Sequence, residues 1–229
     1  MARTFGCSAS AALDILGAWD LPEGMVLESA ERTSTATRTD VRDAKGQIIA
    51  GSAKVHGFRE ELAATFRASD PVISVASYSG EDAAGWCIDE FSISTAKGQK
   101  AQLAIRAHAH RKTPDGALQN HQEATWSTVA DIPPFPWFGA SRFGLGIGVA
   151  DASLQSGTYT VRFLHADADD LDGNWLCGKT IGAVATATFE AVDDTDWSVP
   201  QGWTRTTAGT AERNSAYGRR SLAIEKTLF

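Results

Sequence analysis

The stretch that decides the fold of this chain is residues 100–111, Lys-Ala-Gln-Leu-Ala-Ile-Arg-Ala-His-Ala-His-Arg. Every odd-numbered position from 101 to 109 is Ala, Leu or Ile, whereas the even-numbered positions include a glutamine, an arginine and two histidines. A period of two is typical of a β-strand with one buried face. The stretch therefore predicts a strand that carries His108 and His110 on its polar face.

The same alternation appears within residues 54–68, where Phe58, Leu62, Ala64, Phe66 and Ala68 share one parity and Glu60 interrupts this apolar face. The tetrapeptide Asp43-Ala-Lys-Gly46 is a turn signal upstream of this stretch. We therefore expect a long, charged β-hairpin at about residues 26–68. Alternating or β-branched stretches predict further strands at residues 71–78, 88–95, 157–165, 183–192 and 221–228.

These patterns predict an all-β fold of two packed antiparallel sheets, resembling a sandwich or a barrel, with at most one or two short helices. Ser10 and Gly17 bracket the helix candidate near the start. We expect residues 1–229 to form a single domain. A Pro- and aromatic-rich segment at about residues 113–156 lacks regular periodicity and predicts a functional or interaction loop.

Composition excludes several classes of protein. The chain has 229 residues and a formal net charge of −7, which argues against binding duplex DNA through a basic surface. Residues 151–200 contain nine acidic and two basic side chains, so the net charge of this segment alone, −7, equals that of the whole chain. No apolar run approaches the roughly 18 residues that span a bilayer. We therefore expect no membrane insertion. Three cysteines without a CxxC pair favour reduced thiols, as in the cytoplasm.

His108 and His110 are candidate zinc ligands, because residues two apart in a strand lie on one face. Candidates for a third ligand are three other histidines and one glutamate: His56, His121, Glu123 and His165. Arg106 and Arg111 flank the pair, and their charge opposes a cation. The favoured interpretation is therefore two polar histidines with no metal and no cofactor, and the alternative is a zinc-dependent β-barrel enzyme.

The acidic run before Gly173 resembles a calcium loop, and its members are Asp167, Asp169, Asp170 and Asp172. The register fails, because Ala168 and Lys179 would occupy the first and twelfth ligand positions. A solvated acidic loop is therefore expected.

Other catalytic and binding patterns are weak. Adjacent carboxylates, Glu60 with Glu61 and Asp89 with Glu90, would point to opposite faces of a strand and could not act on one substrate. No catalytic motif is present, so we expect no enzyme activity. The first alternative function, ahead of the zinc enzyme, is a carbohydrate- or receptor-binding β-sandwich whose platform would be built from three tryptophans: Trp175, Trp197 and Trp203.

The layout resembles that of the major tail proteins of long-tailed bacteriophages, the subunits of the tail tube. The resemblance is carried by the hairpin Thr39–Gln47, the paired strands Phe91–His110, the run Phe163–Gly173 leading into Thr186–Glu190, and the ending Gly202-Trp-Thr-Arg-Thr-Thr, Asn214–Tyr217 and Leu222–Leu228. The Pro-rich stretch Ile132–Gly148 departs from it.

The resemblance implies two packed sheets with a small helix, and hexameric rings stacked into a tube through which the genome is ejected. Its partners would be copies of itself and other tail proteins such as the tape measure and the terminator, with DNA passing without specific binding. Such a protein is assembled in the host cytoplasm and resides in the virion tail. Residues expected at inter-ring contacts are Arg38, Asp40, Arg42, Asp43 and Lys45, and those expected at the lumen or a subunit contact are Asp167, Asp169, Asp170 and Asp172.

Overall fold

The computed structural model describes residues 25–69, 72–75, 85–113, 116–119, 132–136, 138–192, 197–207 and 219–228. Its strands are β1 Met25–Thr39, β2 Lys54–Ala68, β3 Val72–Val75, β4 Cys87–Ala96, β5 Gln102–Arg111, β6 Leu118–Gln119, β7 Ile132–Pro136, β8 Leu154–Asp169, β9 Trp175–Ala191, β10 Thr204–Thr207 and β11 Arg220–Thr227. No helix occurs within these ranges, which confirms the all-β class. The helix candidate at residues 10–17 lies outside them.

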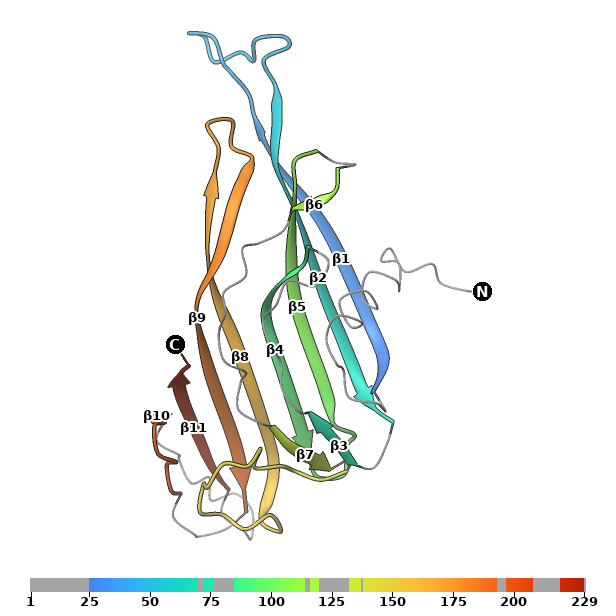
Figure 1. The fold of residues 1–229 in the computed structure, drawn as a ribbon, viewed down its shortest axis with the longest axis vertical. Coiled ribbons are helices and arrows are strands. Elements are labelled where there is room, and N and C mark those ends of the chain that lie inside the picture. The colour runs from blue at the N-terminus through green and yellow to red at the C-terminus, as the bar shows by residue number, and fades with distance from the viewer. Residues whose placement is uncertain are drawn as a thin grey trace, which may run out of the picture.

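Nine strands form one antiparallel sheet in the order β1-β2-β5-β4-β8-β9-β11-β10, with β6 paired to β5 (Figure 1). The sheet stays open, because β1 and β10 stand at opposite ends of this order. β3 and β7 form a separate two-stranded sheet. The expected pair of sheets is therefore one large sheet and one small one, and the barrel variant of that expectation does not occur in the described residues.

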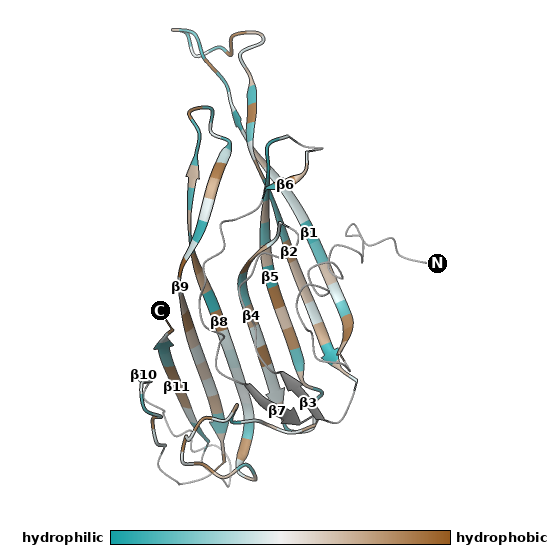
Figure 2. Ribbon diagram, in the orientation of Figure 1, coloured by the Kyte–Doolittle hydropathy of each residue, from teal (hydrophilic) through white to brown (hydrophobic). Residues whose placement is uncertain are grey.

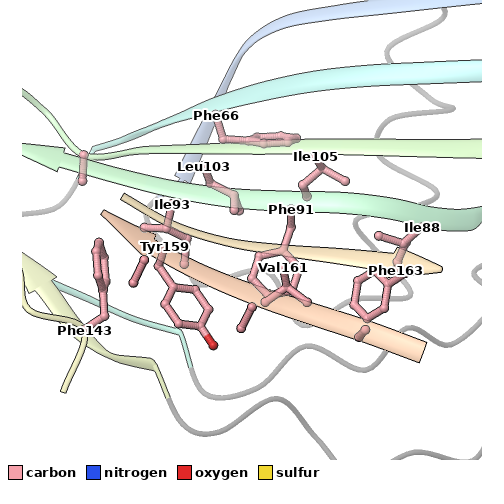
Figure 3. Close-up of a cluster of buried hydrophobic side chains, with 14 of the residues drawn as sticks. Phe66, Ile88, Phe91, Ile93, Leu103, Ile105, Phe143, Tyr159, Val161 and Phe163 are labelled. Carbon is pink, nitrogen blue, oxygen red and sulfur yellow. The ribbon is translucent and has the colours of Figure 1, made fainter. Parts of the chain in front are cut away.

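The buried side of the large sheet is built by the alternation that the sequence displays. Leu103 and Ile105 of β5 lie beside Phe91 and Ile93 of β4, and all four are at most 2% exposed (Figure 3). Val161 and Phe163 continue this layer on β8. On β9 the same layer is made of the small residues Ala183, Ala185 and Ala187. Alternate positions carry polar groups such as Ser92 and Thr160, whose hydroxyl oxygens are 2.9 Å apart.

Part of the expected loop at about residues 113–156 belongs to this core instead. Phe143 packs its ring against Tyr159 and Phe189, with ring centroids 5.9 and 6.2 Å apart. The Ser141 amide donates a hydrogen bond of 2.9 Å to Thr95 Oγ1. β6, β7 and the first residues of β8 also fall within the segment. The sequence pattern did not predict these core contacts, because an irregular segment can bury apolar side chains without a periodic repeat.

The β8–β9 hairpin is longer than the alternation suggested. β9 starts at Trp175 rather than near residue 183, and β8 continues to Asp169. Register shifts occur between Leu164 and His165 and between Ala168 and Asp169. A β-bulge changes which parity faces inward, so it breaks the period of two. Asp167 and Asp169 therefore lie in a strand, and only Asp170 and Asp172 lie in the turn.

Candidate functional site

Two hairpins project beyond the rest of the sheet at the upper end in Figure 1. We name them hairpin end A, residues 38–56 between β1 and β2, and hairpin end B, residues 164–181 of β8 and β9. They touch each other, because His56 Nδ1 lies 2.9 Å from the Gly173 carbonyl oxygen and Lys54 forms an ion pair with Asp172. These contacts hold two segments that are far apart in the sequence in one projecting unit.

Most of the exposed large hydrophobic side chains are on these hairpin ends. Of eleven such side chains among the described residues, four are on hairpin end A and four on hairpin end B: Val41, Ile48, Ile49, Val55, Leu164, Leu171, Leu176 and Ile181. Their exposure ranges from 45% to 109%. Figure 2 shows hydrophobic positions interspersed with hydrophilic ones along both hairpins. The two hairpin ends are therefore a candidate interaction surface.

The charged residues of hairpin end A make contacts within the hairpin. Arg38 Nε donates to Asp40 Oδ1 over 3.0 Å, and Arg42 Nη1 donates to the Gly46 carbonyl over 2.9 Å. Asp43 Oδ1 accepts hydrogen bonds from the amides of Lys45 and Gln47, which builds the expected turn at residues 43–46. An inter-ring role for these five residues remains a prediction. The apolar side chains beside them are exposed as well.

Four acidic residues were expected at a lumen or subunit contact, and they occupy different environments. Asp169, Asp170 and Asp172 are exposed at the end of hairpin end B. Asp170 Oδ1 accepts hydrogen bonds from the amides of Asn174 and Asp172, and the Asn174 bond is the main cause that lowers the pKa of Asp170. Asp167 instead accepts a hydrogen bond of 2.9 Å from Trp175 Nε1. Asp170 is thus a turn-forming residue, and Asp167, which is also exposed, contacts a cluster of largely buried side chains described next.

A cluster of histidines lies at the base of hairpin end B, and it gathers residues from three strands of the sheet. Cys87 of β4 pairs directly with His108 of β5, so the two side chains share a face. The His165 ring of β8 lies 5.3 Å from the His108 ring, and its Nδ1 is 3.4 Å from Cys87 Sγ. Cys87 and His108 are 2% and 1% exposed. His110 is 8% exposed, so the burial of His108 and His110 contradicts the expectation of two histidines on the polar face of an exposed strand.

The second half of the cluster surrounds His110. Its ring stacks on that of Trp175, with centroids 4.9 Å apart and an angle of 6° between the planes. Asp167 Oδ2 lies 3.8 Å from His110 Nε2. Ligand atoms of His108, His110 and Asp167 all lie within 4.8 Å of one another, and the same holds for Cys87, His108 and His165. His108 belongs to both sets.

The surroundings of His165 shift its pKa. Desolvation is the main cause that lowers the pKa of His165 below its usual value, and the nearby Ile88 carbonyl and Asp89 oppose this shift. The neutral ring is the form that can offer a lone pair to a metal ion. The other expected third ligands are elsewhere: His56 contacts Thr39 and Gly173, whereas His121 and Glu123 lie outside the described residues.

Arg111 flanks the histidines in the sequence, and the three tryptophans are the candidates for a binding platform. Arg111 Nε donates to Glu60 over 2.7 Å, so its charge is compensated away from the histidines. Trp175 is buried against His110, and Trp203 packs edge-on against Tyr159 with centroids 6.2 Å apart. Trp197 is partly buried against the core. The three rings are therefore not presented together on one exposed platform.

No protein-family model matches this chain, and no curated protein matches it. Within the described residues, no helix has the length and apolar character needed to cross a membrane. The projecting hairpin ends and the histidine cluster are the two candidate functional features of the described residues.

Proposed function

We propose that this chain is a structural subunit that assembles with copies of itself into rings stacked as a phage tail tube, the conduit for genome ejection. The observation that carries the proposal is the gathering of eight of the eleven exposed large hydrophobic side chains on the two projecting hairpin ends. Full burial of one Val, Leu or Ile side chain contributes about 1.5–3 kcal/mol. A surface with several such side chains favours a stable contact with another protein.

The open sheet supports the same proposal. Within the described residues, β1 pairs only with β2, and β10 pairs only with β11, so each end of the strand order has a strand with one paired side. Unpaired strand edges join sheets across subunits, and a heterologous contact that closes by rotation produces a ring. The proposal places the chain in the virion tail, with DNA passing through the tube and no residue acting catalytically.

The acidic end of hairpin end B fits a conduit better than a binding groove. Asp169, Asp170 and Asp172 are exposed there, and carboxylates repel phosphates. In the proposed tube they line the channel or a subunit contact. Partners of the assembled tube would be other tail proteins of the tape-measure and terminator type.

Negative-stain electron microscopy and sedimentation velocity of the purified protein test this proposal. We expect rings or tubes for the wild-type chain, and loss of these assemblies when the double substitution Ile48→Asp/Ile49→Asp puts charge at the tip of hairpin end A. The matched control is Val199→Asp, an exposed aliphatic residue away from both hairpin ends. A wild-type chain that stays monomeric at every ionic strength would contradict the proposal. Equal assembly by both variants would contradict the role of the hairpin.

A further inference from the structure

The histidine cluster carries an inference that is independent of assembly. We propose that Cys87, His108 and His165 form a zinc site that ties β4, β5 and the base of hairpin end B together. Cysteine thiolates and neutral imidazoles are ligands that bind zinc in proteins, where a fourth ligand completes the tetrahedron. The three ligand atoms already lie within 4.8 Å of one another. In a tetrahedral zinc site with bonds of about 2.0–2.3 Å, ligand atoms are separated by roughly 3.3–3.8 Å.

Hydrogen bonds to the outer ring nitrogens determine how the two imidazoles present their lone pairs. His108 Nδ1 lies 2.7 Å from Asp89 Oδ1, and His165 Nε2 lies 2.7 Å from the Ile88 carbonyl oxygen. A carbonyl and a carboxylate can only accept, so these two nitrogens carry the protons. His108 Nε2 and His165 Nδ1 are then the basic nitrogens. His165 Nδ1 lies 3.4 Å from Cys87 Sγ, slightly nearer than Nε2 at 3.7 Å, and 3.1 Å from Thr180 Oγ1, a hydroxyl that zinc would displace.

This arrangement matches the surroundings of metal-bound histidines. Such residues almost always donate their other N–H to a carboxylate or a backbone carbonyl, which fixes the tautomer and the ring orientation. Here Cys87, Ile88 and Asp89 are consecutive, so one short segment of β4 supplies the thiol and both outer acceptors. The sequence signal is the pair of Cys87 and Asp89, two residues apart, of which Cys87 lies opposite His108 of β5.

The electrostatic environment also favours a cation. Asp89 and Asp167 bring negative charge to the cluster, and Arg111 is paired with Glu60. His110 and Asp167, which form the second trio with His108, are the protein groups from which a fourth ligand can come. His165 follows the register shift at which hairpin end B begins. A metal ion bound there would fix the hairpin relative to the sheet.

Metal binding by the full-length chain is the first test. After chelation and removal of the chelator, competition with a chromophoric zinc indicator is expected to give one tightly bound Zn²⁺ per chain. Zn²⁺ is expected to raise the midpoint of thermal unfolding, because an ion that binds only the folded state stabilises that state. Co²⁺ is expected to give a thiolate-to-metal charge-transfer band in the near ultraviolet.

Cysteine variants identify the thiol. In Cys87→Ser the Co²⁺ charge-transfer band is expected to disappear and zinc affinity to fall by a factor of 100 or more. The matched control is Cys7→Ser/Cys177→Ser, which leaves Cys87 as the single thiol and is expected to keep both properties. Asp89→Asn retains an acceptor oxygen for His108 and is expected to lower zinc affinity by about 10- to 100-fold without affecting the fold.

Circular dichroism in the presence of chelator establishes that each variant is folded. Should Cys87→Ser not fold, His165→Gln replaces it, with the same expected loss of zinc affinity. A folded wild-type chain that binds well under one Zn²⁺, or a control that loses the Co²⁺ band while Cys87→Ser keeps it, would overturn the proposal. Because rings and tubes are scored separately by microscopy, failure of this site leaves the assembly proposal standing, and the reverse also holds.

Discussion

Glu60→Ala is expected to lower the free energy of unfolding by about 3–5 kcal/mol, one of the two largest effects that we foresee. Glu60 is 6% exposed, and its carboxylate is shared by Arg32 and Arg111. Both guanidinium groups are themselves largely covered, and Arg32 also lies over the Trp86 ring at 5.6 Å. Removing the carboxylate leaves two partly buried positive charges side by side without a counter-ion.

The neighbouring residue is a matched control for this experiment. Glu61 lies on the opposite face of β2, is exposed, and pairs with Arg59 over 3.2 Å. An exposed ion pair contributes about 0–1 kcal/mol, so Glu61→Ala is expected to change stability by no more than that. Urea unfolding followed by circular dichroism compares the two variants. Equal losses from the two substitutions would show that burial of the Glu60 network is not what stabilises it.

Gly157→Ala is expected to destabilise the protein by roughly 1–3 kcal/mol through overpacking. Gly157 lies in β8 beneath the covering segment around Ser141. A Cβ added there would lie inside the contact distance of the Ser141 carbonyl oxygen, and 3.1 Å from Phe143 Cε2. The carbonyl cannot turn aside freely, because the Ser141 amide is hydrogen-bonded to Thr95. The segment must therefore lift from the sheet.

Gly146→Ala is the control for Gly157→Ala. A Cβ at Gly146 meets no atom within 4 Å, and its backbone is compatible with alanine. We expect a change within about 0.5 kcal/mol for this variant. Chemical unfolding gives the stabilities, and limited proteolysis reports whether residues 138–150 are released. A Gly157→Ala chain as stable and as protease-resistant as Gly146→Ala would rule out the proposed clash.

The alternation in residues 54–68 and 100–111 was sufficient to predict β2 and β5 and to place their apolar side chains in the core. It also predicted that Glu60 and Glu61 point to opposite faces, which their burial and exposure confirm. These predictions succeed because strand geometry is local: the face of a side chain follows from its parity. Where bulges shift the parity, as in β8, the same reasoning ended the strands too early.

The candidate sites depended more on long-range pairing. The sequence placed His108 and His110 on one face, since that requires only their spacing of two. Burial of these histidines, and the approach of Cys87 and His165, arise from the register between β4 and β5 and from the bulge in β8. Likewise, His56 meets Gly173 across 117 positions of sequence separation. Local periodicity carries no information on which strands become neighbours, so only the tertiary structure brought these groups together.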